Sequence, residues 1–530
     1  MKRKIFLLLL LCLLVITGNG LTQPAQPGGG TGPATWRSFY ERSPFSLDTP
    51  IPDCRSLFIG FIQGTWYEMG YQYGERGAKD IANHFEVDWY NRCRNYSRGW
   101  GKDKTPEERV AYRGAYLARS WKELAKLSLE FIDFLRGVAD GAADELNVAY
   151  FADDIPNHLK ILYLNESDAD LHPNWDFEND RPGPSSSSAS LILSMNDNGQ
   201  ENENGCNSLW VGGEATSTGH AYFHGAIHGG RDKSVTQISY VAIPKDPNAQ
   251  VFWGLNRAGA PFGIGSMANA LGVARASVGC PNAPYPDLGL APGIKDFILS
   301  SYANVFSSSA REAVLLYTRG TPEYRALAGR DSVLRWRSAQ IMFGDANEGF
   351  VVESNANYYF VRTPGYLGEK GSNYIVQSSH FDSTSGSFDA YGNFNPSLSM
   401  ASMSPDYDKT RFWTGMWFLR NNYGKIDLDM VKEFATAHYG YDEEGNFIDV
   451  DPVTGKPTVP DAWSWCTHKN FSEEFPFGAD GQQMTHIVDC TTAEVWYVPN
   501  YPCHYKEWNM EWQYLDLKPF AEYRRLLWGY

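Results

Sequence analysis

The sequence predicts an α+β fold with large, mostly antiparallel sheets, and three observations lead to this prediction. Residues 59–165 carry apolar side chains mainly at helical spacing, and from Ser208 onward the apolar period changes to two. Helical and strand-like stretches then follow one another to the end of the chain. The composition agrees with a large folded core, because 43% of the 530 residues are hydrophobic and 15% are aromatic.

The N-terminus is typical of a secretory signal peptide. Three basic residues precede an apolar run at residues 5–16, and small residues follow it. The run is short for a membrane span, so we expect residues 1–20 to be removed and the protein to be secreted or periplasmic. An uncleaved anchor is the alternative. Residues 21–58 form a tether, rich in proline and glycine at its start, and an N-terminal extension.

Residues 59–205 are expected to form a mostly helical N-terminal fragment. Thr105 and Pro106 carry the N-cap and first-turn signals of a helix, and Gly137 and Gly141 are expected to end the helical run. Residues 182–205 are rich in Ser, Asn, Gly and Glu, which is typical of a loop or linker. The fragment therefore ends in a segment without a core-forming pattern.

Residues 206–530 are expected to hold the core sheets. The strand patterns are SLWVGGEA, HAYFHGAI, TQISYVAI and VFWGL, then AQIMFGD, FVVES, YYFVR and NYIVQSS, and finally the hairpin THIVDC-TTA-EVWYV. Helical patterns lie around residues 294–317, 409–421 and 427–438. The net charge of −16 argues against a nucleic-acid partner, which needs a basic face.

The cysteine count fits an exported chain with one cysteine left over. Cys12 lies in the signal peptide, and the seven others are an odd number, so at least one has no partner within the chain. Cys54 with Cys93, and Cys490 with Cys503, are the candidate disulfide pairs. Their connectivity does not follow from the sequence alone.

Cys206 follows Gly205 at the point where the linker ends and the first core strand begins. This position suits an N-terminal nucleophile, in which the thiol attacks the preceding carbonyl and the resulting thioester is hydrolysed. The freed α-amine, whose ordinary pKa is near 7.7–8.0, then serves as the base for the same sulfur. Glycine before the cut lets the backbone bend sharply. The alternative is a buried or disulfide-bonded cysteine that follows a loop.

Six segments of the chain, in order, resemble one protein family. They are GTWYEMGYQYGE, LRGVADGAADELN with ILYLN, GCNSLWVGGEATSTGHAYFHG, IMFGDANEGFVVESNANYYFVRTPG, DKTRFWTGMWFLRNNYGKIDLDMVKEF and MTHIVDCTTAEVWYVPNYPCH. Together they resemble the acyl-coenzyme A:6-aminopenicillanic-acid acyltransferase family of self-processing N-terminal nucleophile hydrolases. The resemblance runs along most of the mature chain.

The resemblance implies a four-layer αββα sandwich and autoproteolysis between Gly205 and Cys206. Residues 59–205 and 206–530 would then form one interwoven domain whose two fragments stay associated. The implied activity is hydrolysis or acyl transfer at a linear amide bond of a small molecule or peptide, through a thioester on Cys206. No cofactor is implied.

The chain departs from the family pattern at two places. Relatives often carry an Arg and an Asp where this chain has Ala226 and Gly229, and an Asn oxyanion donor within the segment that reads SSHF here, residues 378–381. Other functions therefore stay open. One is a phospholipase B-like or bile-acid-amide-type hydrolase, another is a peptide or peptidoglycan amidase, and a third is a processed but inactive secreted binding protein.

Histidines near the nucleophile are candidate replacements for the missing groups. If the hairpin turn centres near Ser217, Cys206 lies opposite roughly residue 228, within reach of His228. His220, His224 and His228 share one strand face because their spacing is even. Metal binding by these three on a helix is disfavoured by the glycines among them, and ordinary strand histidines are the other interpretation.

Two further site residues are placed by the resemblance. Asn269, in NALG, either lines the pocket as an oxyanion donor or forms a turn. Arg411 is either buried near the nucleophile or an ordinary arginine on a helix surface. His380 keeps the histidine of the family's His-Phe pair and has no assigned role. No metal site is predicted.

Overall fold

The structure is a computed structural model, and it describes the following residues. They are 56–86, 89, 104–146, 155–166, 175–176, 181–182, 206–229, 236–263, 265–279, 293–335, 339–356, 358–366, 373–379, 387–388, 394–395, 406–448, 464–466, 482–498, 502–507 and 511–530. All of them belong to the second of the chain's two units, residues 38–530. The expected signal peptide, most of the tether, the linker from residue 183 to Gly205, and Cys54, Cys93 and Cys280 lie outside the described residues.

The larger of two stacked sheets has ten strands, which pair antiparallel except for the parallel pair β1–β6. In spatial order they are β1 (Ser56–Gly64), β6 (Gln237–Pro244), β7 (Phe252–Arg257), β8 (Ser266–Asn269), β9 (Ala274–Gly279), β10 (Ala339–Gly344), β11 (Gly349–Ser354), β12 (Tyr359–Arg362), β14 (Ser387–Phe388) and β15 (Phe394–Asn395). Long antiparallel sheets of this kind can be covered on one face by helices and on the other by a second sheet.

The smaller sheet has six strands, and each of its pairs is antiparallel. In spatial order they are β13 (Tyr374–Gln377), β4 (Asn207–Val211), β5 (Tyr222–Gly229), β18 (Gln482–Asp489), β19 (Glu494–Val498) and β20 (Gln513–Asp516). A short 3-10 helix, η3 (Gly213–Ala215), lies in the β4–β5 connection. Two further two-stranded sheets pair β2 (Trp175–Asp176) with β3 (Arg181–Pro182) and β16 (Gly440–Tyr441) with β17 (Phe447–Ile448).

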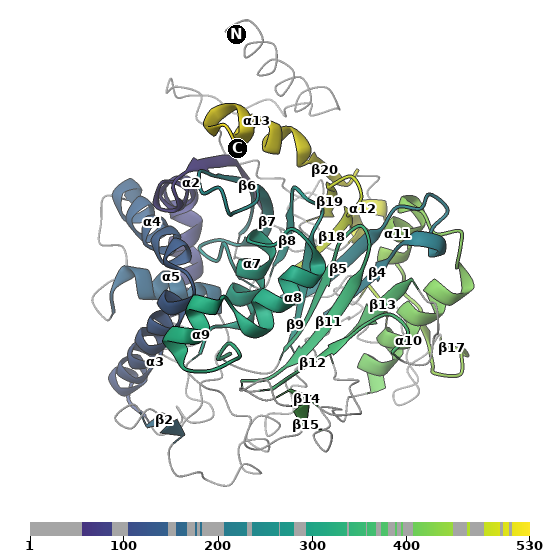
Figure 1. Ribbon diagram of the computed structural model, residues 1–530, viewed down its shortest axis with the longest axis horizontal. Helices are drawn as coiled ribbons and strands as arrows, with labels where there is room; N and C mark the ends of the chain where they lie inside the picture. The colour runs from purple at the N-terminus through teal and green to yellow at the C-terminus, as the bar shows by residue number, and fades with distance from the viewer. Residues whose placement is uncertain are drawn as a thin grey trace, which may run out of the picture. The chain divides into compact units, whose positions relative to one another are not determined.

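Helices cover the outer face of each sheet (Figure 1). The larger sheet is covered by α2 (Trp66–Phe85), α3 (Pro106–Leu127), α4 (Leu129–Leu146), α5 (Asn157–Glu166), α7 (Asp296–Val305), α8 (Ala310–Arg319) and α9 (Pro322–Ala328). The smaller sheet is covered by α10 (Asp406–Asn421) and α11 (Leu428–Ala435). The remaining described helices are α12 (Pro502–Glu507) and α13 (Lys518–Trp528).

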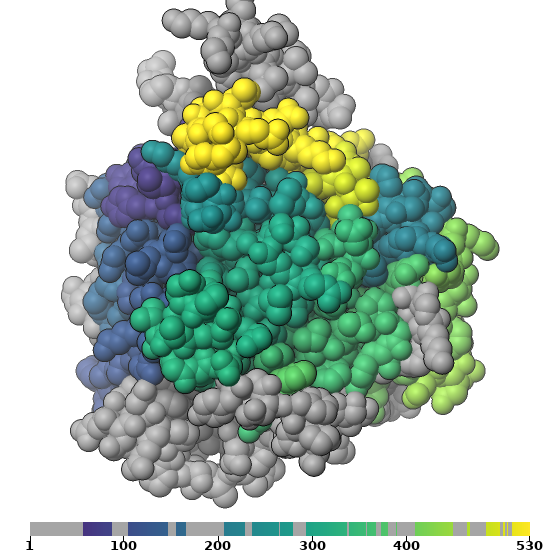
Figure 2. All heavy atoms as spheres, in the orientation of Figure 1, coloured from purple at the N-terminus to yellow at the C-terminus, as the bar shows by residue number. Residues whose placement is uncertain are grey.

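Three apolar cores hold these layers together. Between the sheets, Trp210 and Phe223 of the smaller sheet pack with Trp253 and Met342 of the larger one. A second core joins the larger sheet to its helices, and a third joins the smaller sheet to α10 and α11. The expected α+β class and the αββα layering are therefore confirmed. Figure 2 shows the face covered by α8 and α9, with α13 in yellow packed near β6.

Local signals explain where the first helices begin. Thr65 caps α2 through its side chain, and the Glu68 carboxylate accepts a hydrogen bond from the Thr65 N–H at 2.8 Å, which completes a capping box. Thr105 caps α3 in the same way with Pro106 at the first turn, as predicted. Among the described helices, none is both long and apolar enough to cross a membrane.

The prediction that Gly137 and Gly141 end the helical run is wrong. The break falls at Ser128, and α4 continues through both glycines. A Cβ on Gly137 would lie 2.2 Å from the Tyr67 carbonyl oxygen, and one on Gly141 would lie 2.2 Å from the Tyr71 carbonyl oxygen. The glycines therefore allow the backbones of α2 and α4 to touch.

Strand β1 corrects the expectation of a mainly helical start. It begins at Ser56, slightly before the expected boundary at Ile59, and it pairs in parallel with β6. The sequence patterns of β4–β7, β10–β13 and β18–β19 are confirmed as strands. Strands β8 and β9 complete the larger sheet between them and were not predicted.

Candidate active site

Cys206 directly precedes β4, an interior strand of the smaller sheet that lies between β13 and β5. All five residues of β4 are buried, as expected for a strand covered on both faces. The Cys206 side chain is 1% exposed and belongs to the core between the two sheets. Gly205 lies outside the described residues, so the sequence-predicted cleavage site is described only on its Cys206 side.

Ser379 lies opposite Cys206 on the neighbouring strand end. The β13–β4 register pairs Gln377 with Ser208, and its continuation by two residues brings Ser379 to Cys206. The Ser379 hydroxyl donates a hydrogen bond to the Cys206 carbonyl oxygen at 3.4 Å. Ser379 belongs to the SSHF segment that the sequence analysis treated as lacking a donor. The structure thus places a hydroxyl beside the candidate nucleophile.

The register between β4 and β5 corrects the expected position of His228. Asn207 pairs with Ala226, so the next step places Cys206 opposite Ile227 and not opposite residue 228. A slip of one residue exchanges the two faces of a strand. The backbone of His228 pairs with Gln483 of β18, and its side chain lies outside the described residues.

The row that crosses the sheet at Cys206 is therefore mostly apolar. Its members are Ser379, Cys206, Ile227 and Met484, because β5 pairs Ile227 with Met484 of β18. Ile227 and Met484 are fully buried in the core between the sheets. Such surroundings suit an apolar group next to the sulfur and exclude water from it.

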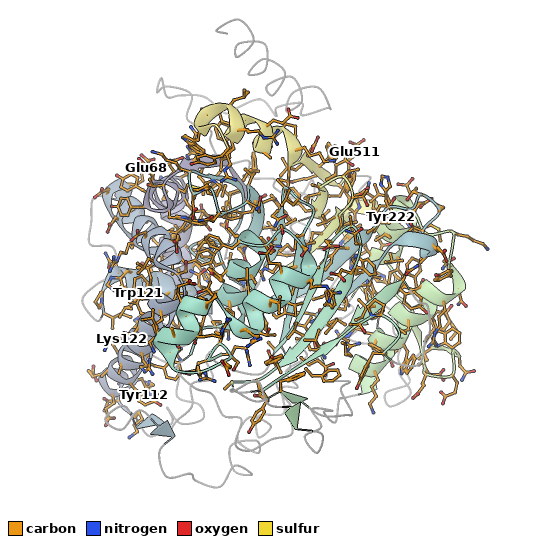
Figure 3. The ribbon with its side chains drawn as sticks, in the orientation of Figure 1. Glu68, Tyr112, Trp121, Lys122, Tyr222 and Glu511 are labelled. Carbon is orange, nitrogen blue, oxygen red and sulfur yellow. The ribbon has the colours of Figure 1, made fainter. Side chains whose placement is uncertain are left out.

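Two other histidines are buried in the smaller sheet. His224 shares a face of β5 with Tyr222, which is labelled in Figure 3, and its ring lies 5.7 Å from that of Trp465. Burial lowers the pKa of His224 to about 3, because the charged imidazolium loses its hydration. His486 lies between the sheets against Phe223, and burial together with nearby His224 holds its pKa well below the usual range. Both rings are neutral at pH 7.

His220 has a different environment from His224. Its Nδ1 lies 2.7 Å from the Asp489 carboxylate, and its side chain is 38% exposed. His224, in contrast, points into the layer of α11 and Trp465. The two side chains therefore have different partners, and within the described residues neither belongs to a group of three metal-ligand side chains.

Asn269 has the contacts of a turn former. Its side-chain amide donates to the carbonyl oxygens of Asn304 and Ser307, at 2.8 and 3.0 Å, and its side-chain oxygen accepts from the Leu271 and Val273 N–H groups. Both amide hydrogens are used at and just after the end of α7, and the side-chain oxygen is used within the β8–β9 turn. We therefore correct the expectation of an oxyanion donor at Asn269.

Arg411 is completely buried on α10. This helix packs against β13 and against β4, the strand that follows Cys206. The interpretation of Arg411 as an ordinary helix-surface arginine is wrong, because this residue is completely buried. His380, the remaining family position, lies outside the described residues.

Two side-chain contacts that the sequence analysis missed fix the start of β4. Asn207 Nδ2 donates to the Trp465 carbonyl oxygen at 2.9 Å, and the Ser208 hydroxyl donates to Gln377 Oε1 at 2.6 Å. Trp465 is itself fully buried and lies 4.7 Å, ring to ring, from Phe434 of α11. The residues after the candidate nucleophile are thus held from both sides. These contacts join distant parts of the chain, so no local sequence pattern predicts them.

The expected Cys490–Cys503 disulfide is also wrong. Cys490 packs in the core between the sheets, where its sulfur lies 3.9 Å from the Gly344 carbonyl oxygen. Cys503 packs against Cys466 in a separate buried cluster. After Cys490 the chain forms β19, which lies beside β18, and then continues to α12, where Cys503 lies.

Comparisons with known proteins give weak likenesses. No protein-family model matches the chain, and a search of curated proteins finds no match. Among solved structures, the chain is similar to a mutant conjugated bile acid hydrolase from Clostridium perfringens, with a TM-score of 0.32 and 12% identity, covering 59% of this chain and 92% of that one. It is also similar to penicillin V acylase from Agrobacterium tumefaciens, with a TM-score of 0.26 and 9% identity, covering 59% of this chain and 86% of that one. At these TM-scores neither likeness supports a conclusion.

Proposed function

We propose that Cys206 is the nucleophile of a self-cleaving N-terminal nucleophile hydrolase that acts on linear amide bonds. The observation that supports this most is the position of Cys206, directly before an interior strand and at the end of a long linker. A sulfur at the start of such a strand has its own α-amine beside it once the Gly205–Cys206 bond is cut. We also propose, from the signal-like N-terminus, that the protein is exported.

The proposed reaction needs only groups of this chain, the amide substrate, and water or a second amine. The α-amine of Cys206 accepts the thiol proton as the sulfur attacks the amide carbonyl carbon. The carbon–nitrogen bond then breaks, the proton passes to the leaving amine, and the acyl group stays on sulfur as a thioester. Water completes hydrolysis by attacking the thioester, whereas a second amine completes acyl transfer.

The surroundings of Cys206 fit an apolar acyl group. Ile227 and Met484 provide an apolar surface in the same row of the sheet, and Ser379 provides a hydroxyl on the other side of Cys206. The Ser379 hydrogen is donated to the Cys206 carbonyl oxygen, so oxyanion stabilisation would come from backbone N–H groups near the nucleophile. A phospholipase B-like or bile-acid-amide-type hydrolase would use the same groups.

The test is turnover on a panel of linear amides with acyl groups of increasing length, beside labelling by a thiol-reactive probe. Wild type should release amine and be labelled at Cys206, and a Cys206→Ala variant should do neither. Cys490→Ala, which removes a buried thiol elsewhere, should keep turnover within about threefold of wild type, since it leaves the row of Cys206 intact. An absence of both turnover and labelling in folded wild type would favour the inactive binding protein instead.

A further inference from the structure

A second group of reactive side chains lies next to the Trp465 segment that supports β4. His438, Cys466 and Cys503 each offer one donor atom, and these atoms all lie within 4.8 Å of one another. Both cysteines are buried, at 0% and 5% exposure, and His438 is partly buried. The proposed reaction gives these three residues no role, and from the sequence only Cys503 was considered, as a disulfide partner of Cys490.

Three separate segments of the chain bring these donors together. His438 follows α11, and the Cys466 N–H donates to the carbonyl oxygen of the adjacent Ala437 at 2.9 Å. Cys503 lies in the first turn of α12, and the Lys506–Glu433 ion pair joins this helix to α11. A backbone hydrogen bond thus joins two of the segments, and an exposed ion pair joins α12 to α11.

The donor set matches the chemistry of a zinc ion. Two thiolates and an imidazole are ligands that zinc prefers, at about 2.3 Å to sulfur and about 2.0–2.1 Å to nitrogen. In a tetrahedral site these lengths place ligand atoms about 3.5–3.8 Å apart, so three donors within 4.8 Å can close on one ion through small side-chain movements. A disulfide would use the two sulfurs only and would not account for the imidazole beside them.

We propose that His438, Cys466 and Cys503 form a zinc site with one open position, which water or a fourth ligand fills. The site lies next to a segment that matters for the nucleophile, because Trp465 accepts the hydrogen bond of Asn207 and precedes Cys466. The bound ion ties α11, residues 464–466 and α12 into one unit. Its role is structural, and it is separate from the acyl chemistry at Cys206.

The test is the zinc content of the purified full-length protein, measured by inductively coupled plasma mass spectrometry after removal of loosely bound metal. We expect about one zinc per chain in wild type. Cys503→Ser and His438→Gln should each lower zinc affinity by at least about tenfold. Loss of a residue that only supports a ligand already lowers metal affinity about tenfold or more, and loss of the ligand itself should lower it further. Cys490→Ser removes a buried thiol outside the cluster and should keep one zinc.

A second readout uses wild type alone, so it does not depend on how the variants fold. With zinc bound, alkylation of Cys466 and Cys503 should be slow, and removal of zinc by a chelator should speed it at least about tenfold, because a metal-bound thiolate is shielded. Alkylation of Cys490 should not change. Wild type without zinc and with a Cys466–Cys503 disulfide in peptide mapping would overturn the proposal, as would an unchanged zinc affinity in His438→Gln.

Discussion

Ser379 donates its hydrogen bond to Cys206 from a strand end that is far away in the sequence. The identity of the residue could be read from the SSHF segment, but its role depends on the register of β13 against β4. Burial decided the other site residues in the same way. Two alternatives stayed open from the sequence for Arg411 and for Asn269, and only their surroundings separate a buried arginine from a surface one and a donor from a turn former.

Ser379→Ala should slow self-cleavage by about tenfold or more, because it removes the hydroxyl that holds the Cys206 carbonyl group. The measurement is the time course of the fragment that begins at Cys206. Ser378→Ala is the matched control, since this neighbouring serine is also buried but lies one position away from the row of Cys206. Equal rates for both variants, at equal melting temperature, would remove Ser379 from the site.

Acid should destabilise the protein through His224. In the unfolded chain its pKa is near 6.5, and in the fold it is about 3, so the unfolded state binds more protons as the pH falls from 6.5 towards 3. The free energy of unfolding should drop by about 1.4 kcal/mol for each pH unit within this window on account of this group. Denaturant unfolding of His224→Phe between pH 6 and 4.5 should show a shallower pH dependence than wild type.

His220→Gln is the control for that experiment, because His220 is partly exposed and paired with Asp489. The slope of the His220 variant should stay closer to that of wild type than the slope of the His224 variant does. An unchanged slope in His224→Phe would contradict the low pKa of the buried imidazole.

At the scale of elements, the best predictions concerned strands and helices whose signals are local. Hairpins such as β10–β11 and β18–β19 have period-two patterns with turn residues between them, and Thr105 with Pro106 marks a helix start. Strands β1 and β8 were missed for two different reasons. β1 finds its parallel partner β6 far along the chain, and β8 has only four residues.

The crossing of α2 and α4 explains why glycines did not break the helix. Gly70 and Gly74 on α2 face Phe134 and Val138 of α4, and a Cβ on either would lie within 2.2 Å of a carbonyl oxygen. Gly137 and Gly141 make the reciprocal contacts on α4. Glycine spacing of four residues on both helices therefore signals close packing here, not a helix end.

Gly137→Ala should lower the free energy of unfolding by about 1–3 kcal/mol, since the added methyl group would overlap the Tyr67 carbonyl group of α2. Gly114→Ala on α3 is the control, because the one atom near the added Cβ is the Ile155 Cγ2 methyl group at 2.9 Å, a side-chain atom that can shift, and not backbone. That variant should be neutral or slightly stabilised by the better helix propensity of alanine. Equal effects of the two substitutions, in chemical denaturation, would contradict the close crossing.

At the scale of the whole molecule, the two fragments expected from self-cleavage share both a sheet and a core. Strand β1 of the N-terminal fragment is paired with β6 of the C-terminal fragment. In the same core, Phe134 and Val138 on the N-terminal side pack with Ile238 and Tyr240 on the C-terminal side. Separating them would break the β1–β6 ladder and expose this core to water.

The fragments should therefore elute together in gel filtration after cleavage and separate only in denaturant. The measurement is the mass and composition of the native peak, with a denatured sample as the control. Elution of free N-terminal fragment under native conditions would contradict the interwoven domain. Zinc removal by a chelator should leave the co-elution unchanged, because all three zinc ligands lie in the C-terminal fragment.

Intact mass spectrometry of the purified mature protein shows whether the chain cuts itself before Cys206. We expect two chains of roughly 21 and 36 kDa without sugars, at the mean residue mass of this chain, with the larger one beginning at Cys206. A Cys206→Ala variant, purified in the same way, should stay in one piece. A single uncut wild-type chain would rule out self-cleavage, and a Cys206→Ala variant that is cut at the same bond would rule out Cys206 as its nucleophile.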